Sequence, residues 1–151
     1  MGISAEGLKN ALDSLAQIEP RFADALTATG YPEARIREPG YATLLRTIVG
    51  QQVSVAAAAS VWNKLEALLG EGCAAHKLIE QDFDALRSCG LSRQKQGYAR
   101  SLAELVVTGE LPLDALPLDD EEAIAYLTKV KGIGRWSAEI YLLFAEGRTD
   151  I

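Results

Sequence analysis

A glycine–isoleucine–glycine triplet between two helix-like segments places the strongest constraint on how this chain folds. Gly132 and Gly134 follow the segment "DEEAIAYLTKV" and precede "RWSAEIYLLFAE". Glycine adopts positive φ angles without penalty, so two glycines one residue apart can turn the chain sharply between helices. The triplet therefore predicts two helices joined by a tight hairpin, with Ile133 as the apolar residue that plugs the turn into the core.

The hairpin has the properties of a small anion-binding site. Its backbone N–H groups and those at the start of the following helix point the same way, and the helix dipole favours negative charge there. Lys131 and Arg135 stand beside the turn. We expect a phosphate group to be held there by backbone amides more than by side-chain charge. The glycine pair alone leaves open a simple helix-to-helix turn with no ligand.

Helical periodicity dominates the rest of the sequence, and no segment shows sustained strand-like alternation. The prediction is an all-α protein. Ser54, Ser92 and Asp119 are typical N-cap residues, and Asp119 with Glu122 has the spacing of a capping box. The expected helices cover residues 5–18, 20–29, 41–50, 55–69, 82–88, 93–107, 120–130 and 135–146.

Composition narrows the possible locations and cofactors. The chain has 151 residues and a net charge of −6, which argues against nucleic-acid binding at the level of the whole chain. No apolar run approaches the ~20 residues of a membrane span, and the first residues do not resemble a signal peptide, so we expect a cytoplasmic location. Cys73 and Cys89 fit no zinc spacing and are expected to be free thiols; His76 has no partner at ligand spacing.

Two stretches of the chain are basic despite the overall acidity. Neither stretch has an acidic residue between its first and last basic residue. Each could face DNA, although a solvated surface is the simpler interpretation. The first contains Arg87, Arg93, Lys95 and Arg100, and the second contains Lys129, Lys131 and Arg135.

The segment "LTKVKGIGRWSAEIYLLFA" resembles the helix-hairpin-helix of the DNA glycosylase superfamily, known as HhH-GPD. The similarity is to the 3-methyladenine DNA glycosylase II branch. Two further segments, "LLRTIVGQQVSVAAAASVWNKL" and "GLSRQKQGYARSLAELVVTGEL", are similar to that family in the same order and spacing. Together the three cover most of residues 41–151.

The resemblance implies a two-lobed helical glycosylase fold with a DNA-binding cleft between the lobes. Residues 41–151 would form the lobe that contains the hairpin. Residues 1–40 would supply the N-terminal helices of the first lobe, whose partner helices are missing, so that this lobe is incomplete. We therefore expect exposed apolar surface on these helices, or oligomerisation through it.

The resemblance also assigns roles at the hairpin and at the earlier helix junction. Val130, Gly132 and Gly134 correspond to positions that hold the DNA backbone. Hairpin carbonyls, Val130 among them, correspond to ligands of a monovalent cation, Na⁺ or K⁺, and no other cofactor is implied. Gln52, with Gln51 beside it, matches the residue that wedges into the gap left by an extruded base. Helix capping is the alternative for this glutamine pair.

Trp136 stands where family members that also cleave the strand have a nucleophilic lysine, so the resemblance implies a monofunctional enzyme. An indole face suits a cationic, alkylated purine, which points to substrates such as 3-methyladenine. Ile140, one turn later, would complete the base pocket, although the best-known branch member has an aromatic residue there. A tryptophan that packs in the core is the alternative.

The catalytic aspartate of the family would lie beyond Ile151, and Asp150 is not assigned that role. The resemblance therefore implies a repair hydrolase for damaged double-stranded DNA, from which this chain, as a truncated form, would show little or no turnover. Two other interpretations stay open: a non-catalytic helix-hairpin-helix module that binds duplex DNA, and an acidic helical interaction protein with no role in DNA binding.

Overall fold

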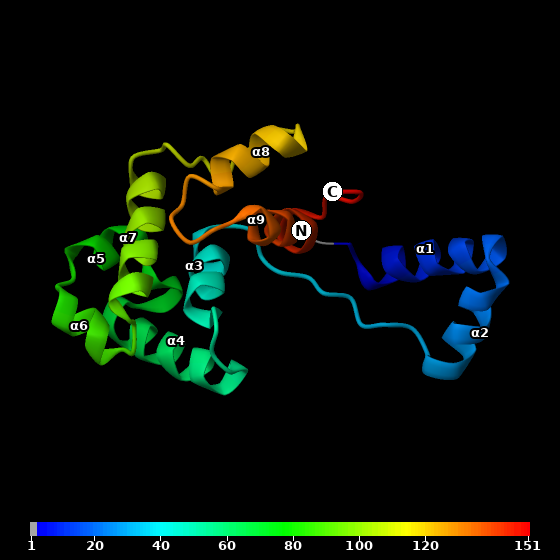
Figure 1. Ribbon diagram of the computed structural model, residues 1–151, viewed down its shortest axis with the longest axis horizontal. Helices are drawn as coiled ribbons and strands as arrows, with labels where there is room; N and C mark the ends of the chain where they lie inside the picture. The colour runs from blue at the N-terminus through cyan, green and yellow to red at the C-terminus, as the bar shows by residue number, and fades with distance from the viewer. Residues whose placement is uncertain (1–2) are drawn as a thin grey trace.

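The computed structural model describes residues 3–151, and every regular element in that range is helical, which confirms the all-α prediction. Figure 1 shows the arrangement. The elements are α1 (Ala5–Ile18), α2 (Pro20–Thr29), α3 (Tyr41–Gly50), α4 (Val55–Leu69), η1 (Glu71–Cys73), α5 (Ala75–Glu80), α6 (Phe83–Ser88), α7 (Arg93–Val107), α8 (Asp120–Leu127), α9 (Arg135–Tyr141) and η2 (Leu142–Glu146).

A single apolar core joins the elements from α3 to η2. Leucines from five of these elements are fully buried in it: Leu44, Leu65, Leu102, Leu127 and Leu142. Helix α7 runs through the middle of this part of the molecule and contacts α3, α5 and α6. Both cysteines are free, as expected, and both are buried. None of the helices in residues 3–151 has the length and apolarity needed to cross a membrane.

The predicted N-caps are confirmed. Ser54 Oγ accepts a hydrogen bond from the Ala57 amide at 3.1 Å, and Asp119 Oδ1 accepts one from the Glu122 amide at 2.9 Å. Ser92 caps α7 in the same way. Such side chains satisfy N–H groups that the first turn of a helix leaves without a partner, so helix starts could be located from the sequence.

Three helical segments differ from the sequence-based expectation. The helix expected to reach residue 130 ends at Leu127, because the chain already turns there into the hairpin. The helix expected to reach residue 146 is α-helical only to Tyr141 and continues as the π-helix η2. Helix α5, which contains His76, and the 3₁₀ turn before it were not predicted, because α5 begins without a capping side chain, whereas α6, of the same length, begins at Asp82, which caps it.

Helices α1 and α2 form a separate pair at one end of the molecule (Figure 1). Neither has a buried residue, and Ile18 is 81% exposed. The exposed apolar side chains expected here are present, whereas oligomerisation and the division of the chain at residue 40 stay predictions. The connector is held to the core by the Gly40 amide, which donates to Tyr141 Oη at 2.7 Å, and by the Arg37 amide, which donates to the Phe144 carbonyl.

Substitution of two leucines of α4, one buried and one exposed, tests where the core lies. Leu65 is fully buried and Leu68 is 41% exposed. Leu65→Ala is expected to lower the free energy of unfolding by about 2–5 kcal/mol, because it leaves a cavity. Leu68→Ala in the same helix should lower it by about 1 kcal/mol or less. Urea unfolding followed by circular dichroism measures both, and equal losses would contradict this core.

Candidate nucleic-acid interface

The hairpin between α8 and α9 turns at a single positive-φ glycine. Gly132 has φ +86°, whereas Gly134 has φ −88° and ψ 175° and serves as the N-cap of α9. The expectation that both glycines supply turn conformations is therefore wrong for Gly134, which is extended. Ile133 between them is 4% exposed, which confirms that it plugs the turn into the core.

Gly132 lies against the ring of Tyr98 in α7. A Cβ atom at position 132 would stand 2.3 Å from Tyr98 Cδ2, closer than any side chain tolerates. A Cβ atom at Gly134 would meet nothing within 4 Å. The first glycine is thus required by the fold, and the second leaves the backbone open to a ligand that approaches from outside.

The amides of the hairpin divide into bonded and free groups. The Lys131 amide donates to Ser101 Oγ at 3.1 Å, and the Ile133 amide donates to the Val130 carbonyl at 3.1 Å. Among residues 3–151, the amides of Gly132 and Gly134 have no acceptor. Both glycines are exposed, and the next amides begin α9, where no carbonyl of the same helix can reach them.

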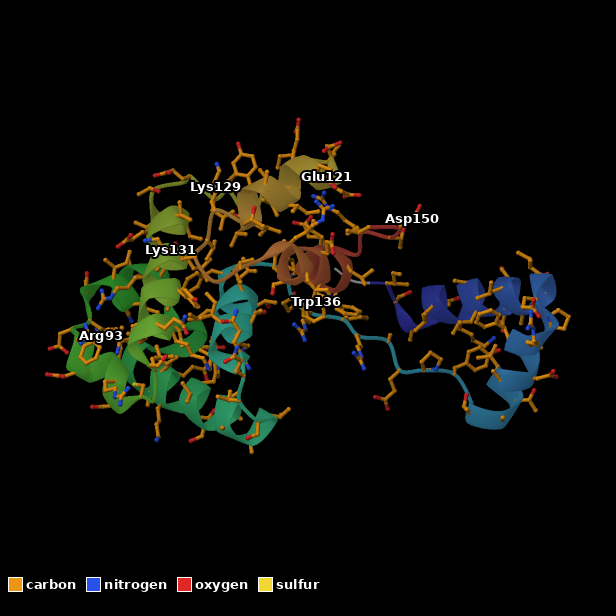
Figure 2. All side chains as sticks on the ribbon, viewed as in Figure 1. Arg93, Glu121, Lys129, Lys131, Trp136 and Asp150 are labelled. Carbon is orange, nitrogen blue, oxygen red and sulfur yellow. The ribbon has the colours of Figure 1, made fainter. Side chains whose placement is uncertain are left out.

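Arg135, predicted to bind DNA, is paired within the protein. Its guanidinium bonds to the carboxylates of Glu121 and Glu139, which raises the pKa of Arg135. Its side chain is still 58% exposed, so the pairs are weak and solvent-screened. Lys129 Nζ lies 4.0 Å from the centre of the Tyr126 ring, and Lys131 is exposed beside the hairpin (Figure 2).

Three of the four cations in the first basic stretch have partners away from the hairpin. Arg93 stacks on Phe83 and lies far from Trp136 in Figure 2. Lys95 Nζ donates to the Val49 carbonyl at 2.7 Å, and burial lowers the pKa of Lys95. Arg100 donates to the carbonyls of Ile79, in the last turn of α5, and of Gln81, the C-cap of that helix. These cations hold helices together, which neither sequence-based interpretation anticipated.

The two glutamines after α3 differ in environment. Gln51 Nε2 donates to the Gly132 carbonyl at 2.8 Å, so this side chain joins the helix junction to the hairpin. Gln52 is exposed and has φ +55°, an uncommon conformation for a residue with a side chain. The helix-capping alternative holds for the backbone of Gln51, which is the C-cap of α3, but for neither glutamine side chain, because that of Gln51 bonds to a distant carbonyl and Ser54 caps α4.

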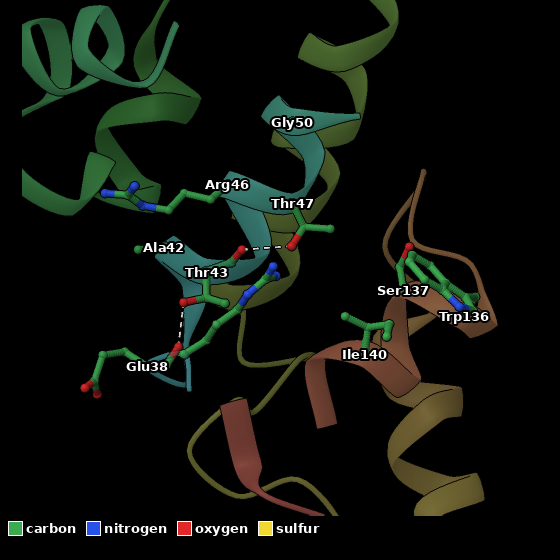
Figure 3. A pocket seen from close by; sticks show the side chains of 10 residues that line it. Glu38, Ala42, Thr43, Arg46, Thr47, Gly50, Trp136, Ser137 and Ile140 are labelled. Atoms are coloured by element: carbon green, nitrogen blue, oxygen red, sulfur yellow. Dashed lines mark hydrogen bonds between the residues drawn. The ribbon is translucent and has the colours of Figure 1, made fainter. Parts of the chain in front are cut away.

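A cavity of about 770 Å³ lies between α3 and α9 (Figure 3). Trp136 and Ile140 both line it, as the base-pocket prediction requires. Trp136 is 72% exposed, so the interpretation of it as a core tryptophan is wrong. Tyr141 is buried and is absent from the cavity wall, as expected from its position on the helix.

The sequence analysis did not identify the opposite wall of the cavity. Residues of α3 and of the chain before it form that wall: Arg37, Glu38, Ala42, Thr43, Arg46, Thr47 and Gly50. On the side formed by α9, Ser137 adds a hydroxyl group. Residues 43, 46, 47 and 50 share one helical face, opposite the buried leucines, and this polar stripe was the available signal. Arg46 is positioned by the ring of Trp62, whose centre is 4.0 Å from its guanidinium carbon.

Asp150 lies in the exposed segment that follows η2, and it has φ +66° (Figure 2). Arg148 anchors this segment through Asp120 and Glu146 and through carbonyls of Pro117 and Leu118. The cavity wall does not include Asp150. In the described part of the chain, no three His, Cys, Asp or Glu residues are grouped to hold a metal ion.

These features, a helix-hairpin-helix with open amides beside a tryptophan-lined cavity, are those of a DNA repair fold. Residues 45–147 match the HhH-GPD superfamily of base excision DNA repair proteins. The chain belongs to this superfamily.

Its relatives include DNA-3-methyladenine glycosylases. The chain is 34% identical over 119 residues to DNA-3-methyladenine glycosylase 1 of Schizosaccharomyces pombe, covering 76% of this chain and 52% of the relative. It is 30% identical over 142 residues to DNA-3-methyladenine glycosylase 2 of Escherichia coli, covering 84% and 50%. The chain therefore spans about half the length of these two relatives.

Two solved structures share the fold. The 3-methyladenine DNA glycosylase of S. pombe in complex with abasic DNA aligns with a TM-score of 0.78 and 30% identity, over 94% of this chain and 72% of that one. A DNA-3-methyladenine glycosidase from Bacillus halodurans aligns with a TM-score of 0.77 and 29% identity, over 90% and 64%. These alignments confirm the predicted glycosylase fold.

The two hairpin glycines form a matched pair for substitution. Gly132→Ala should lower the free energy of unfolding by about 2–4 kcal/mol, because it combines an unfavourable φ with a clash against Tyr98. Gly134→Ala should change it by less than about 1 kcal/mol, since its φ is ordinary and the space around it is open. Thermal unfolding measures the difference, and equal stability of the two variants would contradict this hairpin geometry.

Proposed function

We propose that this chain is the DNA-recognition part of a monofunctional DNA glycosylase, which hydrolyses the N-glycosidic bond of alkylated purines such as 3-methyladenine in base excision repair. One observation carries the proposal: the exposed Trp136 lines a cavity and closely follows a hairpin in which the amides of Gly132 and Gly134 have no acceptor among residues 3–151. Relatives named as 3-methyladenine glycosylases support it.

The hairpin would clasp one DNA strand through the backbone. The open amides of Gly132 and Gly134 and those at the start of α9 would donate to a phosphate, with the helix dipole adding to the attraction. Lys131 would add charge at the edge. Binding mainly through backbone amides would explain how an acidic chain can bind DNA, because these amides do not contribute to its net charge.

The cavity would receive the extruded damaged base. Its volume of about 770 Å³ exceeds that of a purine, so it also admits the sugar and water. The Trp136 ring would stack on the base, and stacking favours a cationic, alkylated purine over a neutral one. Position 136 has no amine, so a Schiff base with the sugar cannot form there.

Hydrolysis would require a carboxylate that stabilises the positively charged sugar and orients water. An alkylated purine already carries positive charge and leaves without much help from a general acid. The expectations that the catalytic aspartate follows Ile151, and that this chain alone turns over little substrate, stay predictions.

Other expectations also stay proposals. A Na⁺ or K⁺ ion at the hairpin would be held by carbonyl oxygens, Val130 among them. The Val130 carbonyl accepts one hydrogen bond, from the Ile133 amide, and retains a second lone pair for a cation. A cytoplasmic location is likewise an expectation from the sequence.

Binding to abasic DNA tests the proposal. Duplex DNA with a tetrahydrofuran abasic analogue should bind more tightly than the intact duplex, because no base must be unstacked. With Lys129 and Lys131 as the basic side chains of the hairpin, log Kd should change with log salt by a slope of only about 2. Fluorescence anisotropy measures both quantities. Equal affinity for the two duplexes would indicate the non-catalytic module, and no salt-dependent binding would exclude a DNA role.

Substitutions at Trp136 test the base pocket. The chain has two tryptophans, and Trp62 is only 4% exposed, so fluorescence quenching by a small solute reports mainly on Trp136. Cationic 7-methylguanosine should bind about 2- to 30-fold more tightly than guanosine, the range expected from a cation–π contact. In Trp136→Phe, discrimination measured by equilibrium dialysis should persist in weaker form, and in Trp136→Ala it should disappear. Retention of full discrimination in Trp136→Ala would rule out this stacking role.

A further inference from the structure

We propose that Gln51 is a positioning residue: its side-chain amide couples the loop after α3 to the hairpin and thereby fixes where Gln52 stands relative to the phosphate clasp. The inference rests on the proposed function and deepens it. It replaces the expectation that Gln51 itself contacts DNA, and it assigns a separate task to each of the two glutamines.

The coupling is a direct hydrogen bond between the two parts of the interface. Gln51 Nε2 donates to the Gly132 carbonyl at 2.8 Å, across 81 residues of sequence. Gln51 is also the C-cap of α3, and its own amide donates to the Ile48 carbonyl at 3.3 Å. The residue is therefore fixed to α3 by its backbone and to the hairpin by its side chain.

One face of α7 holds the same two parts from behind. Lys95, Tyr98 and Ser101 are spaced by three residues, so they lie along one side of the helix. Lys95 Nζ bonds to the Val49 carbonyl at the end of α3. Tyr98 packs on Gly132, and Ser101 accepts from the Lys131 amide. Helix α7 thus contacts both the end of α3 and the hairpin. On the exposed side, the Gln51 side chain links these two segments directly.

Gln52, the next residue, has a positive φ angle, which is unfavourable for a residue other than glycine. A φ of +55° is unfavourable for a residue with a Cβ, and within residues 3–151 no hydrogen bond of its side chain compensates. Its exposed side chain is directed by the backbone that Gln51 anchors. Small displacements of a positioned group weaken its action strongly, so loss of the anchor should affect whatever Gln52 does on DNA.

A double-mutant cycle separates positioning from direct contact. The variants are Gln51→Ala, Gln52→Ala and the pair of both, with Gln94→Ala, an exposed glutamine on α7, as the matched control. For each protein, anisotropy gives the dissociation constants for the tetrahydrofuran duplex and for the intact duplex. The ratio of the two constants is the discrimination. A 2-aminopurine opposite the abasic analogue reports insertion into the gap.

If Gln51 acts through Gln52, each single substitution lowers discrimination about two- to tenfold, the effect of one neutral hydrogen bond. The double variant then discriminates no worse than Gln52→Ala alone, and the 2-aminopurine signal falls in all three. Affinity for the intact duplex and the unfolding midpoint stay within about twofold and a few degrees of the wild type. Gln94→Ala matches the wild type throughout.

Three results would overturn the inference while leaving the proposed function in place. The first is additive losses of discrimination in the double variant, which would mean that Gln51 contacts DNA independently. The second is unchanged discrimination in Gln51→Ala. The third is a loss of affinity in Gln51→Ala that is as large for the intact duplex as for the abasic duplex, which would mean a general structural role. A wild-type chain that shows no preference for the abasic duplex would instead remove the proposed function, and this inference with it.

Discussion

The contact between Gly132 and the ring of Tyr98 is the constraint on which the interface depends. It lets the hairpin approach α7 more closely than any side chain at position 132 would allow. The positive φ of Gly132 then turns the chain, Ile133 enters the core, and α9 begins with its amides exposed. The same turn sets the position of α9, and therefore of Trp136 and Ile140 in the cavity wall.

The distribution of charge shows why a net charge of −6 is compatible with a DNA-facing surface. Much of the basic charge has structural tasks, since Lys95 and Arg100 bond to carbonyls and Arg135 pairs with two glutamates. The hairpin instead offers uncharged donors in a fixed arrangement. Under the proposed function, such a site would select a phosphate by geometry and would attract DNA only weakly over long distances.

Membership of the HhH-GPD superfamily accounts for the order of these elements, while this chain's own residues give them their particular chemistry. The cavity has one exposed aromatic ring, from Trp136, and Ile140 gives it an aliphatic side where a second ring could stand. Thr43 and Thr47 of α3 lie across the cavity from these residues, whereas the Arg46 side chain extends away from them toward Trp62 (Figure 3). Under the proposed function, a base held there would be stacked on one side and would meet threonine hydroxyl groups on another.

The sequence by itself determined most helices, their caps and the position of the hairpin, because periodicity, capping and glycine conformation act over a few residues. It could also identify Trp136 as the residue beside the hairpin. Only the tertiary structure decided that Gln51 bonds to the Gly132 carbonyl and that Lys95 bonds to the Val49 carbonyl at the end of α3. These outcomes depend on contacts between residues tens of positions apart, for which no local pattern exists.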